Sequence, residues 1–147
     1  MNKIVSKRSN LQVFCDGGAR GNPGPAAIGF VVKTGGSRQV YTHKQTVGEA
    51  TNNVAEYKAV IAALRWLVKN LSAINPKVNK IDFFLDSTLV ANQLVGEYKV
   101  KNHALVELYA TAINFIDQID AAINFNIVPR EENQQADALV NHALDSI

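Results

Sequence analysis

Short apolar runs separated by turn residues dominate the first third of the chain. They predict strands over 11–15, 27–32 and about 38–46. The first run stops abruptly at Asp16-Gly17-Gly18, and a Gly/Pro-rich turn covers 19–25. Gly35-Gly36 favours a hairpin between the second and third runs. We therefore expect three consecutive antiparallel strands.

Helix-type spacing replaces this pattern after residue 50. From Tyr57 to Leu71 apolar residues recur every three or four positions, which gives a helix one apolar face. Thr51, Asn52 and Asn53 stand at its start, where short polar side chains can cap free N–H groups. Downstream, the pattern predicts a buried strand over 81–85, helices over about 87–94 and 104–119, a strand over 122–128 and a closing helix over 133–144. This order predicts an α/β fold in which a mixed sheet is flanked by helices.

Composition supports one globular domain over 10–147, preceded by a flexible tail at 1–9. A length of 147 residues fits one core, and 47% apolar with 19% charged residues argues against extensive disorder. The apolar runs are too short to span a bilayer, and the basic tail lacks the apolar core of a secretory signal. The single cysteine, Cys15, cannot form an internal disulfide, so we expect a cytoplasmic protein. A net charge of +2 neither indicates nor excludes binding to nucleic acid.

Four carboxylates hold informative places in this layout. Asp16 and Asp86 each follow an apolar run, so their side chains meet if those two strands are neighbours in the sheet. Glu56 lies four residues before Val60 on the inward face of the long helix, where an unpaired carboxylate is costly. Asp137 lies one turn into the closing helix.

Each acid alone has a purely structural explanation. Asp16 before two glycines is a typical turn residue, and Asp86 can cap the helix that follows it. Glu56 can be a first-turn acid favoured by the helix dipole, and Asp137 a solvated helix residue. Convergence of all four on one sheet edge changes the interpretation, because clustered carboxylates repel one another unless hard cations neutralise them. Oxygen-only ligands favour Mg²⁺ or Mn²⁺ over zinc.

Four segments connect these acids to a known family. They are DGGARGNPGPAAIGF, TNNVAEYKAVIAAL, LDSTLVANQLVGEYKVKN and VPREENQQADALVNHAL, within a region from Leu11 to Leu144. In order and spacing they resemble type 1 ribonuclease H. The resemblance implies the ribonuclease H-like fold, a five-stranded mixed sheet with helices on both sides. It also implies an endonuclease that hydrolyses the RNA strand of RNA–DNA hybrids and leaves 5′-phosphate and 3′-hydroxyl ends.

The residue roles implied by this resemblance centre on two Mg²⁺ ions, or Mn²⁺, bound together with the substrate. Asp16 would bridge both ions, and Asp137 would help hold the ion that activates water. Glu56 and Asp86 would hold the ion that stabilises the leaving oxygen. The positions that match the family's contacts with the 2′-hydroxyls and phosphates of the hybrid are Gly17, Gly18, Asn22, Thr51, Asn52, Asn53, Thr88, Lys99 and Lys101. Plain helix capping is the alternative for Asn52 and Asn53.

The sequence departs from the best-studied members at two places. A short connection over 96–102 replaces a basic helical insert, which leaves Lys99 and Lys101 to meet phosphates and resembles an archaeal and bacterial subgroup. We therefore expect weaker binding of the hybrid. No histidine lies in the loop before Asp137. Arg130 is our candidate substitute, a fixed cation near the phosphate, and an exposed arginine without a role is the alternative.

Packing roles fit the remaining conspicuous side chains. Cys15 should point into the core, away from Asp16, and its neighbours offer no basic partner for a reactive thiol. Tyr57 and Trp66 should line the core or a groove wall.

Three other functions compete with the nuclease. Integrases, resolvases and transposases share the fold and act on DNA, but they generally lack a Gly-rich first loop together with the TNN helix start. A module that binds hybrids or proteins without catalysis would normally have lost one of the acids, and all four are present. A protein that binds Mg²⁺ only for stability is the third alternative. We expect a monomer that binds an RNA–DNA hybrid and no membrane.

Overall fold

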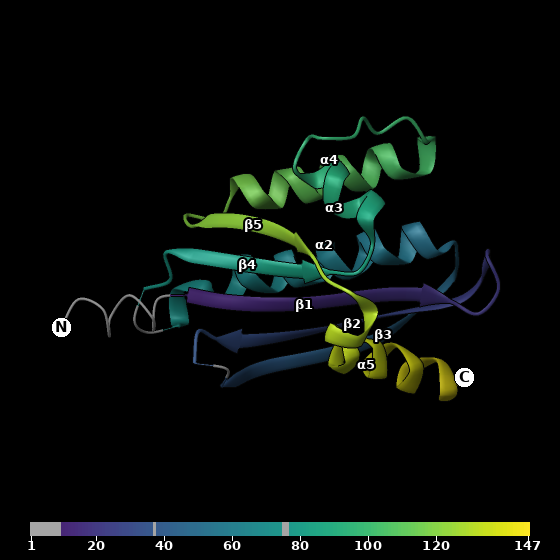
Figure 1. Cartoon of the computed structure of the whole chain (residues 1–147), viewed down its shortest axis with the longest axis horizontal. Helices are drawn as coiled ribbons and strands as arrows, with labels where there is room; N and C mark the ends of the chain where they lie inside the picture. Colours follow the sequence, from purple (N-terminus) through teal and green to yellow (C-terminus); the bar gives the residue numbers. More distant parts are fainter. Residues whose placement is uncertain (1–9, 37, 75–76) are drawn as a thin grey trace.

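The computed structural model describes residues 10–36, 38–74 and 77–147, so the tail predicted at 1–9 lies outside the described residues. Its sheet has the strands β1 (Asn10–Ala19), β2 (Gly24–Thr34), β3 (Gln39–Ala50), β4 (Lys80–Leu85) and β5 (Ala122–Ile127). Their spatial order is β3-β2-β1-β4-β5 (Figure 1). β1, β2 and β3 pair antiparallel, whereas β4 runs parallel to both β1 and β5. This confirms the mixed five-stranded sheet.

Helices cover the two faces of the sheet unequally. They are α2 (Asn52–Asn70), α3 (Thr88–Leu94), α4 (His103–Asp117) and α5 (Gln134–Asp145). The main core packs α2, α3 and α4 against one face, while α5 packs Val140, Ala143 and Leu144 against Ala27 on the other (Figure 1). Cys15 and Tyr57 are fully buried in the main core, as predicted. No helix within the described ranges is long and apolar enough to cross a membrane.

β1 continues past the point where the sequence predicted its end. Asp16, Gly17 and Gly18 pair with residues 29, 28 and 27 of β2, so the predicted stop at Asp16 was wrong. Adjacent glycines favour a turn only locally, and here pairing with β2 overrides that preference. Parallel pairing with β4 ends at Phe14–Phe84. The extension of β1 therefore continues beyond its last pair with β4, and Asp16 lies in this unpaired continuation on the β4 side.

Candidate active site

The parallel pairing of β1 and β4 brings Asp16 and Asp86 together. Each aspartate follows the last pair, Phe14–Phe84, by two positions on its own chain. Asp16 is only 4% exposed, and Asp86 is half-buried. One carboxylate oxygen from each of these residues and one from Glu56 all lie within 4.8 Å of one another. The sequence prediction that the two strand ends converge is confirmed.

Glu56 reaches this pair because α2 packs unusually close to β1. A Cβ atom on Gly17 would lie 2.2 Å from the carbonyl oxygen of Ala55, so only glycine permits this approach of the helix. The Gly17 N–H donates a hydrogen bond of 2.7 Å to Glu56 Oε1. Glu56 Oε2 is buried and has no hydrogen-bond partner among the described residues. Because a buried carboxylate oxygen without a partner is costly, this atom is positioned for a ligand such as a cation.

Asp137 lies on α5, which packs against the opposite face of the sheet from α2. A Cβ on Gly29, the β2 partner of Asp16, would lie 2.7 Å from Leu139 Cβ, so this glycine lets α5 approach the sheet closely. Asn133, just before α5, donates from Nδ2 to the carbonyl oxygen of Cys15 at 2.8 Å. These contacts attach the start of α5 to the strand that carries Asp16. Asp137 itself is half-buried in the first turn of α5.

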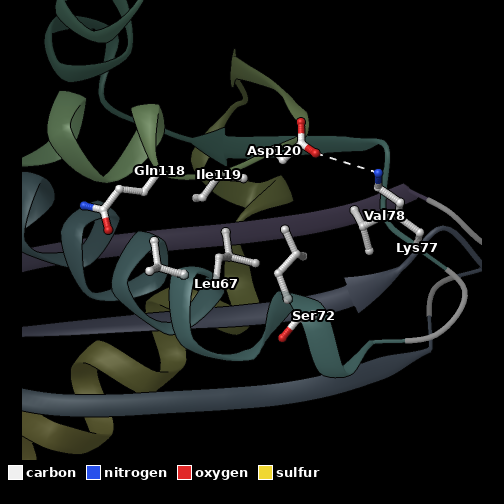
Figure 2. Close-up of a pocket in the computed structure, with 9 residues that line it drawn as sticks. Leu67, Ser72, Lys77, Val78, Gln118, Ile119 and Asp120 are labelled. Atoms are coloured by element: carbon white, nitrogen blue, oxygen red, sulfur yellow. Dashed lines mark ion pairs between the residues drawn. The ribbon is translucent and has the colours of Figure 1, made fainter.

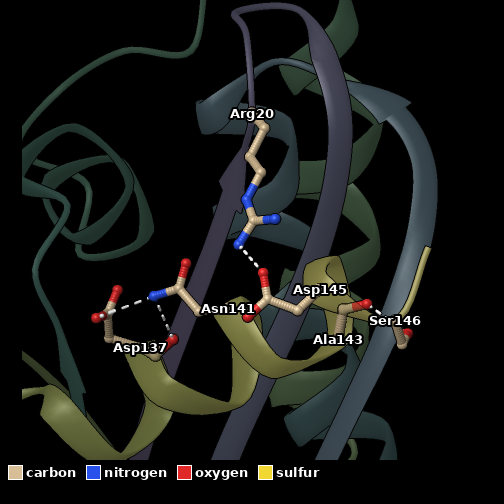
Figure 3. A network of polar contacts seen from close by, with 6 residues as sticks. All are labelled: Arg20, Asp137, Asn141, Ala143, Asp145 and Ser146. Carbon is tan, nitrogen blue, oxygen red and sulfur yellow. Dashed lines mark hydrogen bonds and ion pairs between the residues drawn. The ribbon is translucent and has the colours of Figure 1, made fainter.

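Asn141 holds the Asp137 side chain from one turn further along α5. Its Nδ2 donates to the Asp137 carbonyl at 3.2 Å and lies 3.4 Å from Asp137 Oδ2 (Figure 3). At the far end of the same helix, Arg20 forms an ion pair of 2.6 Å with Asp145 (Figure 3). This pair ties the turn after β1 to α5. Sequence reasoning missed Asn141 and Arg20, although the spacing of four residues between Asp137 and Asn141 was a usable signal.

Burial makes the negative charge of this cluster unfavourable in the absence of cations. Desolvation raises the pKa of Asp16 to about 7, the neighbouring Glu56 carboxyl group partly opposes this rise, and the charges of Asp86 and Asp137 add to it. Burial, followed by the nearby Asp16, raises the pKa of Glu56 well above its ordinary value. Burial also raises the pKa of Asp86, although the cation of Arg130 opposes that rise. The arrangement therefore stores repulsion that a divalent cation can relieve.

One hollow of about 270 Å³ collects most of the predicted site residues. Its lining includes the four acids, Arg130, Gly17, Gly18, Asn52 and Asn53. Thr88 lies in an adjoining hollow that Asp86 and Arg130 also line. Asn22 and Thr51 stand next to the main hollow without lining it, and Lys99 and Lys101 lie on the exposed connection between α3 and α4. The structure thus brings together the acids and the helix start, and it leaves the two lysines outside the hollow.

Hydrogen bonds at the starts of α2 and α3 show which polar side chains cap these helices. Thr51, whose Oγ1 accepts from Val54 N–H at 3.2 Å, caps α2. Ser87 caps α3 in the same way, through Val90 N–H at 3.2 Å. The capping explanation for Asp86 and for the asparagine pair was therefore wrong, because a neighbouring hydroxyl residue caps each helix.

The polar residues around the first loop also hold the loop to α2. Asn52 Oδ1 accepts from Ala19 N–H at 2.9 Å, and Asn22 Oδ1 accepts from Asn52 N–H at the same distance. The side-chain oxygens of both asparagines are thus engaged within the protein. Asn53 is exposed at the rim of the hollow.

Another hollow lies at the opposite end of the parallel strands, before β4 and β5 begin. Leu67, Val78 and Ile119 line it, and the ion pair between Lys77 and Asp120 spans 3.7 Å at its rim (Figure 2). Asp120 is its only carboxylate, and this side chain is almost fully exposed. Cys15 does not provide a reactive centre either, because burial raises the pKa of its thiol well above the ordinary value and so disfavours the reactive thiolate. The chemistry of the described residues therefore concentrates at the four acids.

The fold and the acidic site together define a ribonuclease H-like protein. The family model described as reverse transcriptase-like matches residues 14–143. Among curated proteins, Ribonuclease HI of Halobacterium salinarum is 38% identical over 92% of the chain, and Bifunctional protein Rv2228c of Mycobacterium tuberculosis is 46% identical over 91%. Among solved structures, LC11-RNase H1 in complex with an RNA/DNA hybrid is 38% identical, with a TM-score of 0.86 over 92% of this chain and 97% of that one. The chain belongs to this family, within its type 1 ribonuclease H members.

These relatives differ from the chain in length. The chain spans 35% of the mycobacterial protein and 64% of the Halobacterium protein. It matches almost all of the LC11 structure. The likeness therefore concerns only part of each of these two longer proteins.

Proposed function

We propose that the protein is a metal-dependent endoribonuclease that hydrolyses the RNA strand of RNA–DNA hybrids. The observation that carries this proposal is the group of Asp16, Glu56 and Asp86 oxygens within 4.8 Å, with Glu56 Oε2 buried and unpartnered. Type 1 relatives that are named ribonuclease H, one of them solved with an RNA/DNA hybrid, support the choice of substrate.

The donor set fits two Mg²⁺ ions, or Mn²⁺, because it consists of carboxylate oxygens alone. Asp16 is the candidate shared ligand, since it is close to Glu56 and Asp86 and its charge also interacts with Asp137. Glu56 and Asp86 would hold one ion and Asp137 the other, with Asp16 common to both. When bound, such ions lower the pKa of an attacking water and neutralise the charge that develops on the leaving oxygen.

The protein's own groups restrict the movement of these ligands. The Gly17 N–H donates to the Glu56 carboxylate, and Asn141 Nδ2 lies 3.4 Å from Asp137 Oδ2. Arg130 is exposed at the border between the main hollow and the adjoining one, where its fixed charge can attract a phosphate. We propose that Arg130 positions the phosphate next to the scissile bond.

Selection for RNA would come from contacts with 2′-hydroxyls at the rim of the hollow. A Cβ on Gly18 would meet Asn52 and Val140 at an ordinary contact distance of 3.9 Å, so packing does not require glycine there, and the bare backbone lets a sugar approach closely. The exposed amide of Asn53 can both donate to and accept from a hydroxyl. The Gly17 N–H is already bonded to Glu56, so Gly17 supports the site through packing rather than through that donor. Thr88, Lys99 and Lys101 would meet phosphates further along the duplex.

We also propose which products the protein forms, in which compartment it acts and in which oligomeric state. In-line attack by water on the phosphate would leave 5′-phosphate and 3′-hydroxyl ends. The lone thiol, Cys15, is free and buried, which suits a reducing compartment such as the cytoplasm. The protein would act there as a monomer.

A panel of labelled substrates tests this function. The purified protein is incubated with an RNA–DNA hybrid, duplex DNA, duplex RNA and single strands, with Mg²⁺, with Mn²⁺ or with a chelator. We expect cleavage of the RNA strand of the hybrid alone, and only with a divalent cation. Binding of the hybrid without any cleavage would identify a module without catalysis, and melting stabilised by Mg²⁺ without cleavage would identify a structural metal site.

A further inference from the structure

A second surface, lined by aromatic, aliphatic and cationic side chains, lies between β3 and α2 and shares no lining residue with the acidic hollow. Two neighbouring hollows of about 230 and 410 Å³ form it, and both are lined by Gln45, Ala62 and Arg65. We call them together the β3–α2 groove. Trp66, which lines it, follows Glu56 by ten residues, which is about 15 Å along the helix axis. The groove is thus separate from the acids.

Aromatic rings form one wall of the β3–α2 groove. Tyr41 and Trp66 stack with ring centroids 4.8 Å apart and an interplanar angle of 13°. His43 lies nearly parallel to Tyr41, with centroids 6.4 Å apart and an angle of 14°. All three rings are half-exposed. The sequence predicted that Trp66 lines the core or a groove wall, and the structure shows it in a groove wall with two other flat, partly exposed rings.

Three cations of α2 also line the groove. Lys58, Arg65 and Lys69 lie on one face of α2, at intervals of seven and four residues, and all three line the groove. Arg65 and Lys69 are exposed. No carboxylate belongs to the lining of either hollow. The groove therefore presents a charge of about +3 beside stacked rings, and none of its described lining residues is an acid.

From this arrangement we propose that the β3–α2 groove binds single-stranded nucleic acid. Flat rings that accept bases, together with cations that follow the phosphates, are the combination used for strands whose bases are unpaired. A duplex fits less well, because its base faces are stacked inside the helix. The groove thus binds an unpaired strand, independently of the acidic site.

Trp66 provides a direct test, because it is the only tryptophan of the chain. Its fluorescence is followed while an oligothymidylate of about 15 nucleotides is added in the presence of a chelator. Stacking of a base in the groove should quench the emission in a saturable way. For three neutralised phosphates, the logarithm of the affinity should fall with the logarithm of salt concentration with a slope of about −2.

Two charge reversals and a matched control locate the binding. Arg65→Glu and Lys69→Glu should each weaken binding about tenfold and reduce the salt slope by about 0.7 or more. Lys44→Glu is the control, because Lys44 lies on β3 as well but contacts His142 of α5 on the other face, at 2.8 Å. This variant should bind like the parent. Circular dichroism of each variant confirms that the fold is retained.

Other outcomes would overturn the proposal. Binding of the labelled oligonucleotide without a change in Trp66 emission, and with equal affinity in all variants, would place the strand elsewhere on the protein. Quenching by polyglutamate but not by oligothymidylate would assign the groove to an acidic protein segment. No cleavage is measured, so either failure leaves the proposed nuclease function unaffected.

Discussion

Replacing Asp16 by asparagine should stabilise the metal-free protein at alkaline pH. Burial raises the pKa of Asp16 from 3.8 to about 7, and one pKa unit corresponds to about 1.4 kcal/mol. Ionising Asp16 in the folded protein therefore costs up to about 4 kcal/mol. For a domain of this size, that amount shifts the melting temperature by on the order of 10 °C.

The sign of the pH dependence follows from the direction of the shift. An acid whose pKa is raised in the folded state contributes full stability below its unfolded pKa, near 4, and that contribution is lost as the pH rises through about 7. The metal-free parent should thus be less stable at pH 8 than at pH 5. Asp16→Asn should remove the part of this loss that comes from Asp16, while Glu56 and Asp86, whose pKa values burial also raises, keep their parts. Mg²⁺ should restore stability to the parent at pH 8.

Urea unfolding in a chelator, at pH 5 and pH 8, measures the effect. Asp120→Asn is the matched control, because the Asp120 side chain is almost fully exposed and its ion pair with Lys77 should contribute little. Equal stability of the parent at the two pH values, or an Asp16→Asn variant that is less stable than the parent at pH 8, would refute the argument that the cluster is strained without cations.

Three further predictions concern the packing and the substrate contacts. Gly17→Ala should destabilise the protein by about 1–3 kcal/mol, because the new Cβ would collide with the carbonyl group of Ala55. Gly36→Ala is the control, since a Cβ there would have no atom within 4 Å, and thermal unfolding of the two variants compares their stability. Arg130→Ala should slow hybrid cleavage roughly tenfold and leave metal affinity, measured by calorimetry, unchanged; equal rates would make Arg130 a bystander. A hybrid whose RNA strand keeps a single ribonucleotide should be cut poorly compared with a full RNA strand, and efficient cutting would contradict selection through several 2′-hydroxyls.

The sequence predicted the strand and helix order because periodicity reports which face of each element is buried. It also placed Glu56 inward and Cys15 in the core, and both are buried. It could not predict the continuation of β1 through Asp16, since the glycines that suggest a turn pair instead with β2. This pairing joins residues 9 to 13 positions apart, from Gly18–Ala27 to Asp16–Gly29, and local composition does not report it.

Close approaches between elements were equally hidden in the sequence. Gly29 is needed because α5 lies against it, and Gly17 because α2 does, yet each resembles any other glycine in a strand or turn. Asp86 looked like a cap until the structure showed that Ser87 provides it. The resemblance predicted the polar residues at the rim of the acidic hollow. Only the structure shows which of their atoms already form hydrogen bonds, such as Asn52 Oδ1 with the Ala19 N–H.

The most direct test of the central claim is single-turnover cleavage of an end-labelled RNA–DNA hybrid by the parent, Asp16→Asn and Asp120→Asn, each with Mg²⁺ or Mn²⁺. The account predicts metal-dependent cutting of the RNA strand by the parent and by Asp120→Asn, with 3′-hydroxyl ends, and no cutting by a fully folded Asp16→Asn. Cleavage retained in Asp16→Asn would contradict it, because Asp16 would then not belong to the active site.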